Sequence, residues 1–123
     1  MENKDLVRLK HMLESINAIL AFLQGKQRSH LDTNRMLTSA IIRELAIMGE
    51  AAKHTPLSLR KKDPDIPWKE MAGMRDKLIH EYFGVRHDVV WKTVTARLPQ
   101  VRSQIEKVLK QMNGEMGKTG HIR

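Results

Sequence analysis

Apolar residues recur at alternating spacings of three and four along two long stretches of this chain. The first stretch begins at Asp5 and contains Leu6, Leu9, Leu13, Ile16, Leu20 and Leu23. The second follows Asp88 and contains Val90, Val94, Leu98, Val101, Ile105, Val108 and Met112. This spacing places the apolar side chains on one face of an α-helix, which has to be buried against other helices. The pattern predicts an all-α fold, an antiparallel bundle of four to five main helices.

Helix-ending and helix-starting residues divide the first half of the chain. Gly25 follows the first stripe and is expected to act as a C-cap. The next helix is expected to begin at Asp32 or Thr33, both good N-caps, and to run to about His54, where Pro56 follows shortly. The first half therefore reads as two long helices joined by a short basic connection.

The second half is divided by prolines. Residues 57–67 read as a loop with one helical turn, and Pro67 is well placed in the first turn of a helix that extends to Phe83-Gly84. Asp88 is expected to cap the last helix, which Pro99 should kink. Two further helices are thus predicted.

The segment from Leu45 to Ala52 is apolar on nearly every side and predicts the central helix of the bundle. Gly49 within it would let another backbone come close. Glu50 is a charge in an apolar setting, and two interpretations of it stay open. It is a structural ion-pair partner, with Arg35 or Arg43 as ordinary surface partners elsewhere on the helix, or it is a catalytic carboxylate.

The composition limits the class of protein. The 123 residues suffice for one core, expected over residues 1–113, followed by a mobile basic tail over 114–123. Cysteine is absent, which excludes disulfides and thiolate metal sites and fits the reducing cytoplasm. The charged first ten residues lack the apolar core of a signal peptide, and no run is long enough to span a bilayer. We expect a cytoplasmic protein without membrane association, and the net charge of +8 favours a polyanionic partner.

Residues 75–82 read Arg-Asp-Lys-Leu-Ile-His-Glu-Tyr and bring three different chemical groups together. Arg75 supplies a permanent cation, His80 exchanges protons near neutral pH, and Tyr82 offers a hydroxyl that can be modified. This set suits the cleavage of a phosphodiester. These residue types at these spacings arise by chance in roughly a few of every thousand chains of this length.

The outline RxxxxHxY on a helix of a small all-α protein resembles the HEPN superfamily of RNA-cleaving domains and, through Tyr82, the HepT toxins. Residues 47–52, Ile-Met-Gly-Glu-Ala-Ala, and the stretch from Ile66-Pro67-Trp68 to Gly73-Met74 are also similar to that group. The resemblance covers roughly residues 4–112. It departs from the family pattern at Asp76, where asparagine is most often expected.

This resemblance implies a HEPN-like fold and a homodimer that cleaves RNA without a cofactor. HepT toxins are paired with a minimal nucleotidyltransferase antitoxin of the MntA type, so the resemblance also implies a toxin-antitoxin system of a type II-like or type VII kind. The partner is expected to transfer AMP to Tyr82. Each added phosphate would bring negative charge next to Arg75 and repel the RNA backbone.

The positions of the motif residues on an ideal helix limit the mechanism. Arg75 and His80 lie about 140° apart, so a two-fold dimer would be needed to pool them in one cleft. Asp76 lies one turn before His80, and its carboxylate either orients the imidazole or makes an ordinary surface pair. With His80 as general base or acid and Arg75 on the phosphate, the neighbouring 2′-hydroxyl can attack without a metal ion. No pair among the other histidines has convincing metal-ligand spacing.

Basic residues near the motif are candidate RNA contacts. Arg60, Lys61 and Lys62 are either merely solvated or touch RNA phosphates, and Lys77 is a further candidate. Two rival interpretations of the whole chain stay open: a non-catalytic basic module that binds nucleic acid or a nucleotidyltransferase, and a scaffold with a structural motif. Aromatic residues are 4% of the chain, which argues against a platform for stacked bases.

Overall fold

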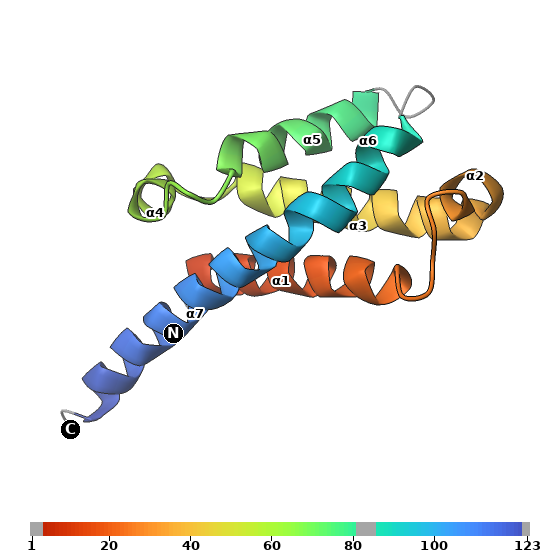
Figure 1. The fold of residues 1–123 in the computed structure, drawn as a ribbon. Helices are drawn as coiled ribbons and strands as arrows, with labels where there is room; N and C mark the ends of the chain where they lie inside the picture. The colour runs from red at the N-terminus through yellow and green to blue at the C-terminus, as the bar shows by residue number, and fades with distance from the viewer. Residues whose placement is uncertain (1–3, 81–85, 122–123) are drawn as a thin grey trace.

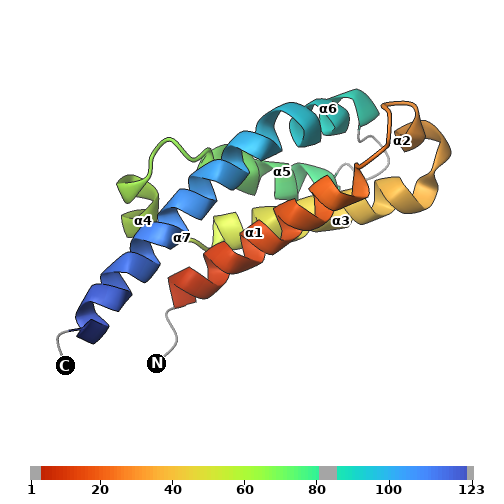
Figure 2. The same ribbon diagram turned by 60° about the horizontal axis from the view of Figure 1, so that its bottom comes forward.

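The computed structural model describes residues 4–80 and 86–121, and within these ranges the chain contains helices and no strand. The long helices are α1 (Lys4–Phe22), α3 (Arg35–Lys53), α5 (Trp68–His80) and α7 (Leu98–His121). Successive long helices run in opposite directions along the bundle (Figures 1 and 2). The predicted all-α antiparallel bundle is therefore confirmed.

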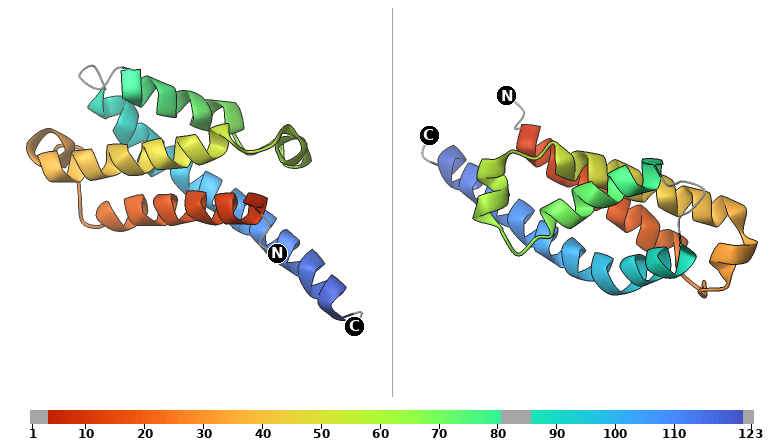
Figure 3. Two further views of the ribbon diagram at one scale, coloured as in Figure 1. Left: turned by 180° about the vertical axis from the view of Figure 1, so that it is seen from behind. Right: turned by 90° about the horizontal axis from the view of Figure 1, so that it is seen from above.

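Short helices connect the long ones. These are α2 (His30–Thr33), α4 (Leu57–Lys62), α6 (His87–Lys92) and the π-helix η2 (Thr93–Arg97). Helix α4 corresponds to the one helical turn predicted within residues 57–67. Helices α6, η2 and α7 follow one another without a break, and α7 crosses α1 obliquely before its C-terminal part diverges from the bundle (Figures 1 and 3).

Asn34 separates α2 from α3 and caps the longer helix. Its backbone is extended, with φ −112° and ψ 91°, and its side chain accepts a hydrogen bond of 3.0 Å from the Leu37 N–H. The prediction that Asp32 or Thr33 caps this helix was wrong, because both lie inside α2. Asn34 is an equally good N-cap residue, and the local sequence did not distinguish the three.

Asp88 and Pro99 shape the last helical stretch differently from the expectation. Asp88 is not the cap of α6, because the helix begins at His87 and its N-cap residue is Arg86. The Asp88 carboxylate pairs with Arg28 at 2.6 Å. Pro99 has no N–H to donate to the Thr95 carbonyl, and its ring crowds that carbonyl. The distortion predicted for Pro99 takes the form of the π-helical turn η2, which ends two residues before it.

The structure also describes the end of the first helix and most of the C-terminal tail. Gly25 follows α1 with φ +73°, a backbone conformation that glycine adopts at little cost, as expected of a helix-ending residue. Helix α7 continues to His121, so the tail over 114–123 is helical as far as that residue. Its mobility stays a prediction.

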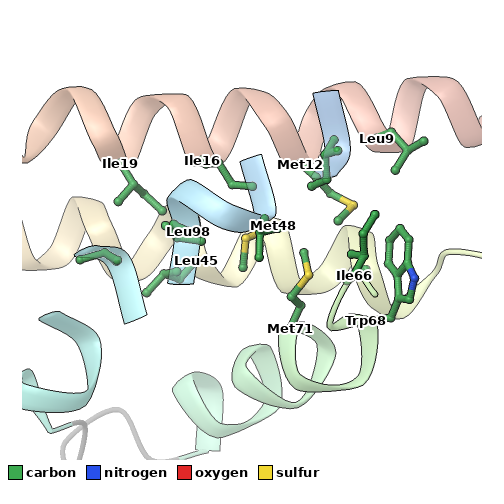
Figure 4. Close-up of a cluster of buried hydrophobic side chains, with 14 of the residues drawn as sticks. Leu9, Met12, Ile16, Ile19, Leu45, Met48, Ile66, Trp68, Met71 and Leu98 are labelled. Carbon is green, nitrogen blue, oxygen red and sulfur yellow. The ribbon is translucent and has the colours of Figure 1, made fainter. Parts of the chain in front are cut away.

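The core lies between α1, α3, α5 and α7. Figure 4 shows buried side chains of α1 and α3 facing one another, with Met71 of α5 and Leu98 of α7 completing the cluster. Helix α3 packs against α1 on one side and α5 on the other, which confirms its central position. Complete burial of one such aliphatic side chain contributes about 1.5–3 kcal/mol, so the apolar stripes supply most of the stabilisation.

Candidate functional site

Helices α3 and α5 come into backbone contact at Gly49. A Cβ atom at position 49 would lie 2.7 Å from the Met71 carbonyl oxygen and 3.1 Å from the Arg75 nitrogen, and it would overlap the Arg75 Cβ. Only glycine fits at this point. The predicted close approach at Gly49 is therefore confirmed, and the backbone that approaches is that of the motif helix at Arg75.

Glu50 follows Gly49 and pairs with Arg75. Glu50 Oε2 is buried and lies 2.5 Å from Arg75 Nε, although the Nε–H does not point at this oxygen well enough to count as a hydrogen bond. The Glu50 side chain as a whole is 43% exposed and that of Arg75 is 26% exposed. The pair is therefore half-buried. The cation of the pair, Arg75, belongs to the motif helix α5, and the sequence did not identify it as the partner of Glu50.

His54 and Asp76 extend this pair into a network. His54 Nε2 lies 2.8 Å from Glu50 Oε1, one turn further along α3. Asp76 Oδ1 accepts a hydrogen bond of 2.9 Å from Arg75 Nη1 and lies 3.5 Å from Lys53 Nζ. Arg75 is thus held between two carboxylates, one from each helix.

The network favours the ionised form of both carboxyl groups. The hydrogen bond with His54 lowers the pKa of Glu50 despite its partial desolvation, and the charge of Arg75 adds to this effect. The hydrogen bond from Arg75 lowers the pKa of Asp76, with a further contribution from Lys53. Both groups are therefore anionic at neutral pH, so Arg75 meets negative charge on two sides.

The remaining motif residues follow at the end of α5. His80 is the last residue of α5 that the structure describes, so Arg75 and His80 are on one continuous helix about 140° apart. The predicted end of this helix at Phe83-Gly84 lies outside the described residues. The His80 side chain and the whole of Tyr82 lie outside the described residues. The predicted Asp76–His80 pair and the modification site at Tyr82 therefore stay predictions. Among the described residues, the Asp76 carboxylate bonds Arg75 and Lys53.

Arg60 has a structural task that sequence reasoning missed. Its guanidinium donates hydrogen bonds to the carbonyl oxygens of Ala52 (2.7 Å), Lys53 (2.9 Å) and Thr55 (3.0 Å) at the C-terminal end of α3. The Ala52 carbonyl also accepts a hydrogen bond of 3.2 Å from the Thr55 N–H. A cation is favoured at the C-terminal end of a helix. The other three candidate RNA contacts, Lys61, Lys62 and Lys77, are exposed. RNA contact by any of the four residues stays a prediction.

A second ion-pair cluster joins α2 to the start of α6. Arg28 pairs with Asp32 at 3.0 Å and with Asp88 at 2.6 Å, while His87 Nδ1 lies 2.8 Å from Asp32 Oδ1. The hydrogen bond with His87 is the main cause of a lowered pKa for Asp32, and Arg28 adds to it. The cluster fixes the point at which the chain enters its last helical stretch. The Arg28–Asp32 pair has the spacing of one helical turn, whereas Asp88 and His87 lie more than fifty residues from their partners and no local pattern indicated these two contacts.

Among the side chains that the structure describes, those of residues 4–78 and 86–113, no group of three or more His, Asp or Glu is placed to hold a metal ion. Over residues 4–80 and 86–121, no helix combines the length and the apolar character needed to cross a bilayer.

Comparison with known proteins gives a consistent result. A family model described as ribonuclease HepT-like matches residues 12–108. A probable ribonuclease HepT of Thermococcus cleftensis is 52% identical over 102 residues, which are 83% of this chain and 93% of the relative. Relatives from Caldanaerobacter subterraneus subsp. tengcongensis and Methanocaldococcus jannaschii are each 39% identical, over 103 and 107 residues. These matches cover 84% and 87% of this chain and 92% and 88% of the relatives, whose names give RNase as a provisional assignment. No solved structure gives a significant match.

Proposed function

This chain belongs to the HepT-like ribonuclease family, and on that basis we propose that it is a metal-independent endoribonuclease that acts as the toxin of a toxin-antitoxin system. The observation that carries the proposal is the placement of Arg75 on α5. Its guanidinium is half-buried and held from two sides, five residues before His80 on the same helix. A fixed cation near a group that exchanges protons is what phosphodiester cleavage requires.

The proposed reaction uses the RNA's own nucleophile. His80 removes the proton of the 2′-hydroxyl, whose oxygen forms a bond to the adjacent phosphorus while the bond from phosphorus to the 5′-oxygen breaks. The protonated His80 gives this proton to the 5′-oxygen as it leaves. Arg75 stabilises the extra negative charge on the phosphate. The products are a 2′,3′-cyclic phosphate and a 5′-hydroxyl.

Supporting residues have proposed parts in substrate binding. Asp76 is proposed to orient the imidazole of His80, from which it is separated by one helical turn. Lys61, Lys62 and Lys77 are exposed and are proposed to attract the RNA backbone, with Arg60 as a weaker candidate because of its bonds to α3. The net charge of +8 supports a polyanionic substrate.

A homodimer is the proposed active form. Arg75 and His80 project about 140° apart from α5, so one copy of the helix does not direct both at one phosphate. A two-fold axis beside α5 would bring Arg75 of one protomer next to His80 of its partner. The cell compartment proposed for this dimer is the cytoplasm.

The proposed partner is an MntA-like nucleotidyltransferase that adds AMP to Tyr82. Tyr82 is the only tyrosine of the chain and lies seven residues after Arg75, nearly in line with it on an ideal helix. A phosphate attached there would meet the guanidinium and exclude the RNA backbone. This step belongs to regulation and is separate from the cleavage chemistry.

A cleavage assay tests the proposed function. The purified chain is incubated with defined RNAs in the presence of EDTA, and the ends of the products are identified by mass spectrometry. We expect cyclic phosphate ends, no cleavage when the scissile nucleotide lacks its 2′-hydroxyl, and no cleavage by a folded His80→Ala variant. Activity that requires magnesium, or that persists in His80→Ala, would contradict the mechanism. Binding of RNA without cleavage by the unaltered chain would instead support the non-catalytic module.

A further inference from the structure

Arg75 reaches its position through a chain of contacts that starts on α3. Gly49 lets the two helices touch, and the next residue, Glu50, extends its carboxylate to Arg75 Nε at 2.5 Å. His54 holds the other oxygen of the same carboxylate at 2.8 Å. The carboxylate is therefore fixed at both oxygens, one of which is buried.

A guanidinium is a rigid planar fork, so contacts at two of its nitrogens fix its orientation. Glu50 Oε2 lies next to Nε, and Asp76 accepts a hydrogen bond from Nη1. The guanidinium of Arg75 would therefore already be oriented when a phosphate binds to it. Such preorganisation strengthens the interaction with charge that develops during a reaction.

We propose that Glu50 is a positioning residue for Arg75, one that sets the orientation of the guanidinium toward the scissile phosphate without touching the RNA itself. This inference rests on the proposed function of the site. Three contacts point to it: the close approach at Gly49, the buried Oε2 facing Nε, and the support of Oε1 by His54.

A competing role for Glu50 makes the opposite kinetic prediction. A carboxylate that merely neutralised Arg75 would compete with the phosphate, and its removal would tighten RNA binding and raise the rate of cleavage. A positioning carboxylate leaves the binding of RNA nearly unchanged, and its removal slows the chemical step. The division of the effect between kcat and KM therefore separates the two roles.

The kinetic test compares Glu50→Gln with Glu44→Gln, a matched control that removes a half-buried glutamate from the same helix. We expect Glu50→Gln to lower kcat by about 10-fold to 100-fold with KM changed less than about threefold, because misplacement of a catalytic group by about 1 Å has effects of this size. Glu44→Gln should keep the unaltered values. In an Arg75→Lys background, Glu50→Gln should have no further effect, because lysine lacks the nitrogen that Glu50 contacts. An unchanged kcat in Glu50→Gln, a lowered KM, or an equal effect in the lysine background would overturn the proposal.

A spectroscopic test does not depend on activity. In ¹⁵N-labelled protein, the Nε–H signal of Arg75, assigned by its loss in Arg75→Lys, should exchange slowly with solvent because Nε lies 2.5 Å from the buried Glu50 Oε2. We expect exchange to become about tenfold faster in Glu50→Gln, a change that corresponds to about 1.4 kcal/mol. An Nε–H exchange rate that Glu50→Gln leaves unchanged would overturn the proposal, whatever the cleavage assay shows. Loss of all RNase activity in the unaltered chain would contradict the proposed function, while the hold of Glu50 on Arg75 would still be decided by this signal.

A second variant covers the case in which Glu50→Gln does not fold. His54→Ala removes only the support of Glu50 Oε1, from a side chain that is 59% exposed. It should leave the fold intact, lower kcat by a smaller factor than Glu50→Gln, and speed the exchange of the Arg75 Nε–H. A folded His54→Ala variant with unchanged exchange and unchanged kcat would count against the chain of contacts.

Discussion

The backbone nitrogen of Arg75 on α5 lies 3.1 Å from the position that a Cβ atom of residue 49 on α3 would occupy. The position of Arg75 therefore depends on glycine at position 49, because α3 and α5 pack against each other at these two residues. Any enlargement of residue 49 must move the helix that carries the candidate catalytic groups.

Gly49→Ala should destabilise the protein and impair cleavage. The added methyl group overlaps Arg75 and the Met71 carbonyl, and such overpacking costs about 1–3 kcal/mol. Gly73→Ala is the matched control, because a Cβ on that helical glycine would meet no atom within 4 Å. It should stabilise the protein by about 0.5–1 kcal/mol. Urea unfolding of both variants gives the comparison, and a Gly49→Ala variant as stable as Gly73→Ala would contradict the close approach.

Arg60 and its neighbour Lys61 should separate helix capping from RNA contact. Arg60→Ala removes three hydrogen bonds to carbonyls at the end of α3 and should lower the free energy of unfolding by about 1–3 kcal/mol. Lys61→Ala should change the free energy of unfolding by less than about 0.5 kcal/mol. The same variant should bind RNA more weakly, and its RNA affinity should depend less on the salt concentration. Thermal unfolding and RNA titrations at several salt concentrations measure the two effects. Equal stability of the two variants would remove the capping role from Arg60.

Acid should destabilise the protein through its paired carboxylates. Asp32 has a pKa below its ordinary value, mainly because of the hydrogen bond with His87 and also because of Arg28. Since its folded pKa is lowered, Asp32 contributes stability that is present above its unfolded pKa and is lost as the pH falls through the folded pKa. Asp32→Asn should therefore be less stable than the unaltered chain at pH 7, and the difference should shrink below about pH 4. Urea midpoints between pH 7 and pH 3 would show this, and a difference that grows in acid would contradict it.

Mixing two inactive variants should restore cleavage if the proposed dimer shares its sites. In a heterodimer of Arg75→Ala and His80→Ala, one of the two clefts would combine an intact Arg75 with an intact His80 of the partner. Random re-pairing gives half heterodimers, each with one of two sites intact, so activity should return to about a quarter of the unaltered value. Activity is measured after joint unfolding and refolding of the two variants. No recovery in a mixture shown to contain heterodimers would contradict the shared cleft.

Tyr82 should be the residue that a cognate nucleotidyltransferase modifies. Incubation with ATP and a nucleotidyltransferase encoded in a neighbouring reading frame should add one or more AMP groups and abolish cleavage, because the added phosphate would lie over Arg75. Intact-mass analysis and peptide mapping locate the adduct, with Tyr82→Phe as the control that should neither gain mass nor lose activity. An adduct on another residue would refute this step and leave the nuclease mechanism untouched.

The helices were predictable from the sequence because helix formation and burial are read from neighbouring residues. The spacing of apolar residues predicted the long helices. Gly49 predicted a close approach of another backbone, although the sequence did not identify α5 as that backbone. Helix ends were less certain, since Asp32, Thr33 and Asn34 are all suitable caps and only packing selects Asn34.

The contacts around Arg75 were not predictable from the sequence. Glu50 and Arg75 are 25 residues apart, and no local pattern distinguishes Arg75 from the other arginines as the partner of Glu50. The spacing of Glu50 and His54, one helical turn, did offer a signal for their pair. The sequence did not predict that Arg60 caps α3, because the run Arg60-Lys61-Lys62 is equally typical of a solvated or a phosphate-binding surface.

The π-helical turn η2 corrects the register of the last helical stretch. Val90, Val94 and Leu98 are buried and follow one another at spacings of four, a series that would drift about 40° per step around a regular α-helix. In η2 the Leu98 N–H bonds the Thr93 carbonyl, five residues back, so each turn is wider and four residues fall nearer to one revolution. The side chains of α6 and of α7 thereby point at one core. Deleting one residue from 93–97 would restore a regular α-helix and rotate the whole of α7 relative to the bundle.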